Sequence, residues 1–265
     1  SLLFKLTNVN IKTFIAYAKE HPEDFLSPPV FPECDRPIPK GEGFTEQHMQ
    51  GEFSKGVKEA IKNGELYLGK DHINIYTDLW EGQVIINATR ILKVDSLNPK
   101  DLTFSEIDGR KQTFSVINFL RKNVPGFESC RILQTGTQIG VRESRRIIGE
   151  YILTENDVIE ARKFEDGVAK GSFGLDIHDP TSLGHPYETL ENMGVPKGGG
   201  YYDIPYRCLV PKKIENLLVA GRCISGTYLA HSSYRIMPTC MAIGEAAGTA
   251  AALSVKHKVS PRKLD

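Results

Sequence analysis

The sequence predicts an α+β fold, in which a mixed β-sheet is flanked by helices. Short β-rich runs bounded by turn residues lie in the middle of the chain, and helical patterns precede and follow them. Hydrophobic residues make up 40% of the 265 residues, which is enough to bury a core and excludes a disordered chain. The length fits one large domain or two modest ones.

Residues 1 to about 64 are predicted to be helical around a proline-rich break. A first helix is expected over Val9–Ala18, because its apolar residues recur at helical spacing. The prolines between Pro22 and Pro39 predict an irregular connection, since proline fits neither a central strand nor a helix interior. A second helix is expected over Glu46–Asn63, where Gly64 provides a common C-terminal signal.

Residues 65 to about 210 are predicted to mix strands with helices. Two strands are expected at Ile73–Thr77 and Gln83–Ile91, around the turn residues Glu81-Gly82. Two more, Arg131–Ile139 and Arg145–Leu153, are expected around Gly140. In a strand, Arg142 and Arg146 would share one face and Arg145 would take the other.

Two helix starts in this region carry capping signals. Thr103 and Glu106 match the capping box, so a helix is expected from there to about Val124, before Pro125-Gly126. Thr154 with Asp157 predicts another start.

The C-terminal residues form a third pattern. Asn216–Gly221 is a short apolar run that ends in glycine, typical of a buried strand whose end approaches another group closely. Pro238 suits the first turn of a helix expected to reach His257, and this helix is rich in alanine and glycine. A strand, a glycine turn and a small-residue helix suit a dinucleotide, because free amides at a helix N-terminus favour an anion. A plain packing helix has the same composition, since alanine is the best helix former.

Charge and cysteine content exclude several classes of protein. The 33 basic residues balance 33 acidic ones, which argues against a nucleic-acid or membrane-surface binder. Five widely spaced cysteines form no CxxC pair, so neither a disulfide framework nor a zinc site is expected. Free thiols favour a reducing compartment and a cytoplasmic protein.

The segment of residues 216–253, NLLVAGRCISGTYLAHSSYRIMPTCMAIGEAAGTAAAL, resembles the C-terminal flavin-contacting segment of the FAD-dependent oxidoreductase family with a glutathione-reductase-like fold. Residues 140–151, GVRESRRIIGEY, followed by Leu153-Thr154, are similar to that family too, as are residues 86–90 and 204–207. The resemblance implies a flavoprotein that transfers a hydride between a small-molecule substrate, which the residues do not identify, and FAD.

The resemblance also implies a division of the chain. Residues 1–203 are expected to form a substrate-side α+β domain, and residues 204–265 the C-terminal part of an FAD-binding, Rossmann-type domain. That fold holds the FAD pyrophosphate on a G-x-G-x-x-G turn, which this sequence lacks. The chain is therefore expected to be a fragment of a longer enzyme. By itself it should be inactive, should bind no FAD, and should self-associate through the exposed remnant of the flavin domain.

The resemblance also implies site residues, at the positions of this sequence that match the family. The cofactor-binding residues implied are Gly221, Arg222, Ser225, Arg235, Ile236 and Met237. Arg142 and Arg145 are expected to anchor an anionic or polar substrate group, and His231 and Tyr234 to transfer protons beside hydride transfer.

Simpler interpretations also fit these residues. The arginines also fit a solvated strand face paired with Glu143 and Glu150, and His231 fits a structural hydrogen-bonding role. The same arginine face would serve a non-catalytic ligand-binding domain. A metal-dependent hydrolase would use a loop that runs from Asp176 through His178 and Asp179 to His185, but that spacing matches no known ligand pattern and no metal is expected.

Overall fold

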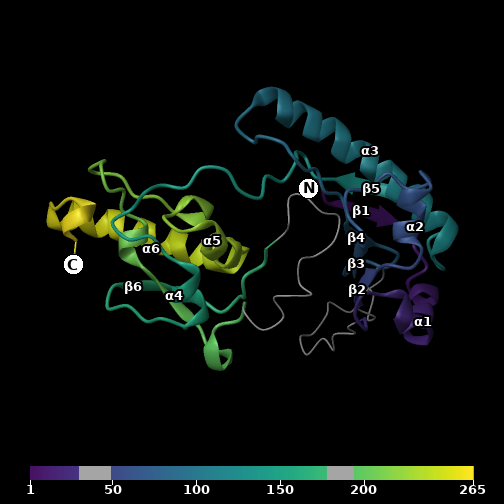
Figure 1. The fold of residues 1–265 in the computed structure, drawn as a ribbon, viewed down its shortest axis with the longest axis horizontal. Helices are drawn as coiled ribbons and strands as arrows, with labels where there is room; N and C mark the ends of the chain where they lie inside the picture. The colour runs from purple at the N-terminus through teal and green to yellow at the C-terminus, as the bar shows by residue number, and fades with distance from the viewer. Residues whose placement is uncertain (30–48, 178–193, 265) are drawn as a thin grey trace. The chain divides into compact units, whose positions relative to one another are not determined.

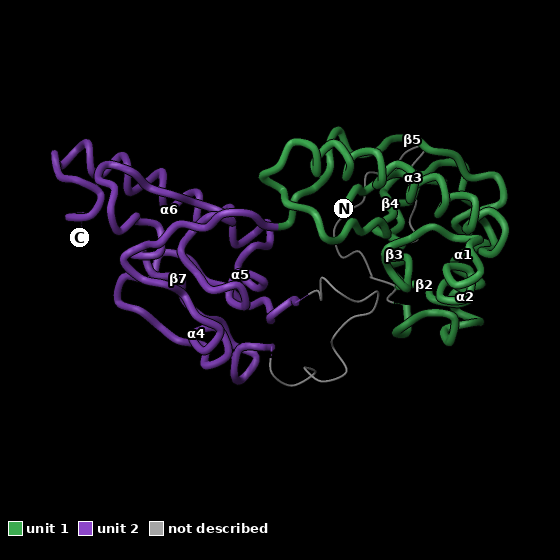
Figure 2. The backbone as a smooth tube through the Cα atoms, turned by 45° about the horizontal axis from the view of Figure 1, so that its top comes forward, with its two compact units in different colours: residues 1–142, 180–184 green, residues 143–179, 185–265 purple. Residues whose placement is uncertain are grey.

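The structure is a computed structural model that describes residues 1–29, 49–177 and 194–264. It divides the chain into two compact units (Figures 1 and 2). Unit 1 begins at Ser1 and extends to Arg142, and unit 2 takes the described residues from Glu143 onward.

Unit 1 is built on a five-stranded sheet in the order β2-β3-β4-β1-β5. Every neighbouring pair in it is antiparallel. Its strands are β1 (Phe4–Thr7), β2 (Gln50–Phe53), β3 (Ile73–Thr77), β4 (Val84–Asn87) and β5 (Arg131–Thr135). Gly82, with a φ of 70°, forms the turn between β3 and β4 that the sequence predicts.

Three helices share one apolar core with this sheet. They are α1 (Ile11–Glu20), α2 (Val57–Lys62) and α3 (Pro99–Asn123). Asn10 caps α1 with its side chain, and Asn98 does the same for α3, because each accepts a hydrogen bond from a backbone N–H of the first turn. Helix α1 confirms the helix predicted over Val9–Ala18.

Two helix predictions in unit 1 are wrong in part. Over Glu46–Asn63, the described residues form strand β2 and then the short helix α2, although the end at Asn63-Gly64 is confirmed. The edge pairing with β3 outweighs helix propensity there. Helix α3 begins four residues before Thr103, whose hydroxyl donates to the Pro99 carbonyl inside the helix instead of forming the predicted cap.

Unit 2 has a separate core around a two-stranded antiparallel sheet. Its elements are α4 (Glu155–Ile159), β6 (Gly167–Gly171), β7 (Tyr202–Pro205), α5 (Tyr228–Tyr234) and α6 (Met237–His257), with short 3-10 helices that include η5 (Gly221–Cys223). The predicted helix from Pro238 to His257 is confirmed as α6. Among the described residues, no single helix is long and apolar enough to cross a bilayer; α5 and α6 meet that test only as a pair, bent by 94°.

Two predicted strands of unit 2 do not form. Arg145–Leu153 is irregular chain with isolated bridges at Gly149 and Leu153. Asn216–Gly221 is also irregular, with Asn216 at a φ of 54° and Leu217 exposed by 40%. A strand needs a partner along its length, and no described strand pairs with either segment.

The boundary between the compact units differs from the one expected at residue 203. The described residues 143–177 and 194–203 belong with the C-terminal segment, because β6 pairs with β7 and both pack in one core with α5 and α6. The assignment of a substrate-side part and a flavin-side part stays a prediction.

The capping box of α4 is confirmed and gives a stability prediction. Buried Asp157 accepts hydrogen bonds from Thr154 N at 2.9 Å, Thr154 Oγ1 at 2.8 Å and Arg162 Nη1 at 3.0 Å. Burial alone would raise the pKa of Asp157, but these donors outweigh it and hold its pKa below the usual value. We expect Asp157→Asn to lower the free energy of unfolding by about 1.5 kcal/mol at neutral pH.

The pH dependence of this effect has a definite sign. A depressed pKa in the folded chain stabilises it above the unfolded value of about 3.9, and that stabilisation is lost as pH falls through the folded pKa. Urea unfolding of wild type and variant should therefore differ at neutral pH and converge in acid. Exposed Glu165 gives the control, since Glu165→Gln should change neither curve. A constant difference at every pH would contradict the prediction.

Candidate functional site

The site forms where an irregular loop, residues 143–153, lies along the chain that leads into α5. The backbone N–H of Ile147 donates to Cys223 O at 3.0 Å, and that of Leu153 donates to Ser225 O at 3.2 Å. Thr227 N in turn donates to Leu153 O at 2.8 Å. These bonds hold the loop residues against the first turn of α5.

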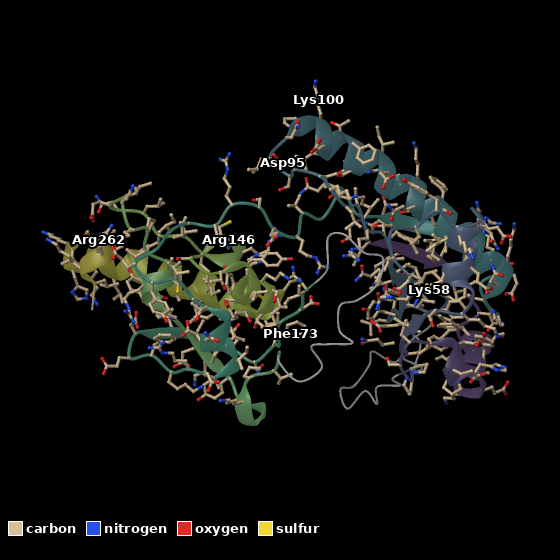
Figure 3. The ribbon with its side chains drawn as sticks, in the orientation of Figure 1. Lys58, Asp95, Lys100, Arg146, Phe173 and Arg262 are labelled. Carbon is tan, nitrogen blue, oxygen red and sulfur yellow. The ribbon has the colours of Figure 1, made fainter. Side chains whose placement is uncertain are left out.

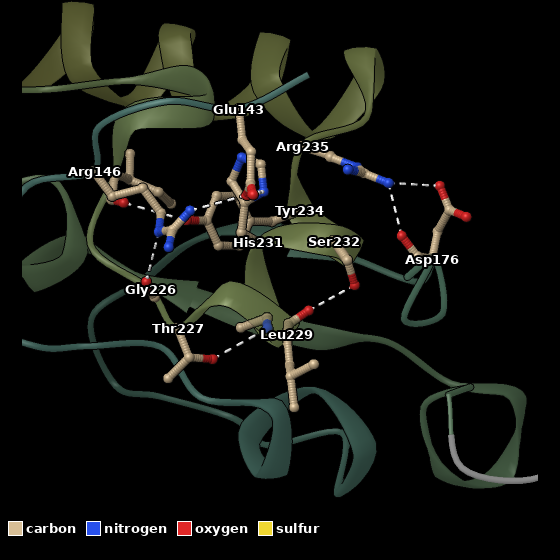
Figure 4. A network of polar contacts seen from close by, with 12 residues as sticks. Glu143, Arg146, Asp176, Gly226, Thr227, Leu229, His231, Ser232, Tyr234 and Arg235 are labelled. Atoms are coloured by element: carbon tan, nitrogen blue, oxygen red, sulfur yellow. Dashed lines mark hydrogen bonds and ion pairs between the residues drawn. The ribbon is translucent and has the colours of Figure 1, made fainter. Parts of the chain in front are cut away.

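Three charged or titratable side chains meet at this place (Figure 4). Glu143 Oε2 lies 3.2 Å from His231 Nδ1 and 3.1 Å from Arg146 Nη1. Arg146 Nε also donates to the Gly226 carbonyl at 3.1 Å. The side chain of His231 is 1% exposed, whereas that of Glu143 is 32% exposed. The cluster therefore presents Glu143 toward solvent and holds His231 behind it.

Tyr234 supports the histidine from the buried side. Its ring meets the His231 ring edge to face, with centroids 5.3 Å apart. Its hydroxyl donates to Ile224 O at 3.2 Å, and burial raises its pKa well above the usual value for tyrosine. These contacts favour a supporting role over the proton transfer expected for Tyr234.

Arg235 stands at the bend between α5 and α6. Its guanidinium donates from Nη2 to both the backbone O and Oδ2 of Asp176, at 2.7 and 2.8 Å (Figure 4). Cys240 Sγ lies 3.4 Å from Arg235 O, so the first turn of α6 is tied back to the end of α5. Arg235 is thus fixed by Asp176, a partner that the sequence did not indicate.

The residues expected to hold the cofactor differ in exposure. Arg222 is exposed on η5, and Met237 is 76% exposed at the start of α6. Ile236 provides the N-cap of α6 without a side-chain hydrogen bond. Ser225 is fully buried, so its hydroxyl reaches a ligand only if the chain around it rearranges.

Arg142 and Arg145 lie on opposite sides of the unit boundary, and both are exposed. Within unit 1, a Cβ on Gly69 would overlap the Arg90 carbonyl oxygen, so the backbone next to Lys70 packs directly against Arg90. Burial, with further effects of Arg142 and Arg90, lowers the pKa of Lys70 to about 8, although Glu52 opposes the shift. Lys70 therefore lies among two arginines, Arg142 and Arg90, and two carboxylates, Glu52 and Asp71.

FAD, which the resemblance implies, fits part of unit 2. A Cβ added at Gly221, where φ is 74°, would meet nothing within 4 Å, so this turn is open to close approach. The start of α6 carries no side-chain cap, and its dipole favours negative charge there. The sequence has no G-x-G-x-x-G fingerprint for the pyrophosphate, so the fit covers only part of the cofactor.

The described residues give no support to the alternative of a metal-dependent hydrolase. The described part of the chain holds no group of three or more His, Cys, Asp or Glu side chains able to bind a metal ion. Of the expected loop, Asp176 pairs with Arg235, and His178, Asp179 and His185 lie outside the described residues.

Sequence reasoning missed Glu143. It lies three residues before Arg146, and that spacing indicated an ordinary surface pair. Its contact with His231 spans 88 positions and depends on the irregular loop, which no local pattern predicts.

Comparison with known proteins gives one match. The sequence model of the family described as FAD dependent oxidoreductase matches residues 7–265, nearly the whole chain. Neither the search of curated proteins nor the search of solved structures gives a match.

Proposed function

This chain belongs to the family of FAD-dependent oxidoreductases, and on that premise we propose that it transfers a hydride between a small-molecule substrate and FAD. FAD, when bound, accepts or donates the hydride. The protein then has to hold the substrate, move the accompanying proton and stabilise charge near the flavin.

The cluster of Glu143, Arg146 and His231 is the observation that carries this proposal. It places acid–base groups beside residues 221–237, the segment that resembles the flavin-contacting part of the family. Hydride transfer from a carbon that bears an O–H or N–H releases a proton, and a positioned carboxylate or imidazole accelerates that release. Arg222 and the start of α6 would supply the positive potential on the flavin side.

The fragment status of the chain is a further part of the proposal. Without the glycine fingerprint, we expect chain 1–265 to retain little FAD, and the coding sequence upstream of Ser1 to supply the missing turn. Self-association through the exposed face of α6, where Met237 and Met241 are 76% and 71% exposed, is expected on the same grounds.

The test uses protein loaded with FAD, expressed with its upstream sequence if chain 1–265 does not retain the cofactor. Secondary alcohols, 2-hydroxy acids and amino acids are mixed with it without oxygen, because each carries a C–H beside an O–H or N–H. We expect one class to bleach the visible absorbance of the flavin. His231→Asn should slow that bleaching by about 10²–10⁴-fold at unchanged flavin content.

Exposed His257 at the end of α6 gives the matched control, and His257→Asn should bleach at the wild-type rate. Equal rates for both histidine variants would exclude His231 from the reaction, both as the group that moves the proton and as the group that positions it. A flavin that no class reduces, in a protein that still binds these compounds, would favour the non-catalytic ligand-binding domain.

A further inference from the structure

Within this cluster, we infer that Glu143 is the residue that exchanges the proton with the substrate, while His231 holds it from behind. The inference rests on the proposed function and names the reacting group within the same site. The evidence for it is the difference in burial between the two side chains: the His231 imidazole is 1% exposed, whereas the Glu143 side chain in contact with it is 32% exposed. A ligand that approaches from solvent reaches Glu143 first.

The contacts of Glu143 suit a group that gains and loses a proton in place. Oε2 lies within 3.2 Å of both Arg146 Nη1 and His231 Nδ1, which holds that oxygen in place. Arg146 is itself held by the Gly226 carbonyl, and the His231 ring is held by Tyr234. A base supported on both sides needs little rearrangement when the substrate arrives.

As the substrate is oxidised, its O–H or N–H proton would pass to a carboxylate oxygen of Glu143, and the hydride that leaves the adjacent carbon, with both electrons of the C–H bond, would be taken up by FAD when it is bound. His231 keeps its Nδ1 proton directed at Oε2 throughout. The charged groups around the imidazole are Glu143 and Arg146 on the loop, and Arg235 with Asp176 beyond α5 (Figure 4).

Two variants of Glu143 separate proton exchange from mere positioning. The amide of Glu143→Gln still accepts the Nδ1 proton of His231 but takes up no proton from the substrate. Glu143→Ala removes both functions. If Glu143 only oriented His231, the Gln variant would keep its activity and the Ala variant would lose it.

The first readout needs neither flavin nor substrate. In chain 1–265, ¹⁵N NMR of the imidazole should show the Nδ1–H tautomer of His231 in wild type and in Glu143→Gln, and a loss of that preference in Glu143→Ala. The control is Glu150→Gln, because Glu150 is another arginine-paired glutamate of the same loop. It pairs with Arg262 (labelled with Arg146 in Figure 3) and should leave the signal unchanged.

The second readout is reduction of the bound flavin by the compound class that reduces wild type. Glu143→Gln should slow it about 100-fold at wild-type Tm and flavin content, Glu143→Asp should recover part of the rate, and Glu150→Gln should match wild type. A Gln variant with the wild-type tautomer and the wild-type rate would overturn the inference, as would an unchanged tautomer in Glu143→Ala. A flavin that no compound class reduces in the wild-type protein would instead count against the proposed function.

Discussion

Gly149→Ala should destabilise unit 2 by about 3 kcal/mol, the upper part of the usual range for an overpacked core. A Cβ at this buried position would stand 2.8 Å from Ser225 Cβ and 2.9 Å from the Arg207 carbonyl. The Val210 carbonyl, at 3.2 Å, closes the remaining side. Two of these three neighbours are backbone atoms, so they cannot yield as the end of a flexible side chain would.

The measurement is thermal unfolding, where we expect Tm to fall by about 10 °C. The Nδ1–H signal of His231 should weaken as well, because Gly149 anchors the loop that carries Glu143. Gly244→Ala gives the matched control. Gly244 is exposed on α6 with nothing within 4 Å of an added Cβ, so alanine should stabilise the helix by about 0.5–1 kcal/mol. Two variants of equal stability would show that the loop adapts to a methyl group at Gly149.

Elements that depend on local signals could be predicted from the sequence. Helices α1 and α6 were predictable because apolar spacing, Pro238 and capping residues act within a few positions. The capping box of α4 is a local signal of the same kind, and it is confirmed. The α+β class follows from such elements together.

Contacts between distant segments were not predictable. The loop of residues 143–153 has the composition of a strand, yet it pairs through single bridges to Pro211 and Gly226. Strand propensity depends on the neighbour, and the neighbour is set by the whole fold. For the same reason His231 was identified as a candidate, whereas its partner Glu143 was not.

The second large effect concerns Arg142, at the end of unit 1, for which we predict a part in substrate binding. Arg142→Ala should lower kcat/KM about 30- to 1,000-fold for an anionic substrate, which corresponds to about 2–4 kcal/mol of lost charged hydrogen bonding. Arg142 contributes to the positive charge that, after burial, lowers the pKa of Lys70. Glu52 and Asp71 act on the same lysine in the opposite direction, so an anion that binds there depends on the positive charges of both Arg142 and Lys70. Exposed Arg131 on β5 gives the control, and Arg131→Ala should leave kcat/KM unchanged.

Lys70 gives this prediction a pH signature. Because its pKa is about 8 in the folded chain, the ammonium loses its proton within an accessible range. An anionic substrate should therefore bind more weakly as pH rises past that value. Lys70→Met should bind the substrate weakly at every pH, so the change of affinity with pH should disappear. In Arg142→Ala that change should move to higher pH, because the removal of a neighbouring positive charge raises the pKa of Lys70.

The measurement is KM against pH for wild type and both variants with the 2-hydroxy acid or amino acid that reduces the flavin. A step that persists in Lys70→Met would assign the titration to another group, and an unchanged KM in Arg142→Ala would leave Arg142 a surface residue without a part in substrate binding.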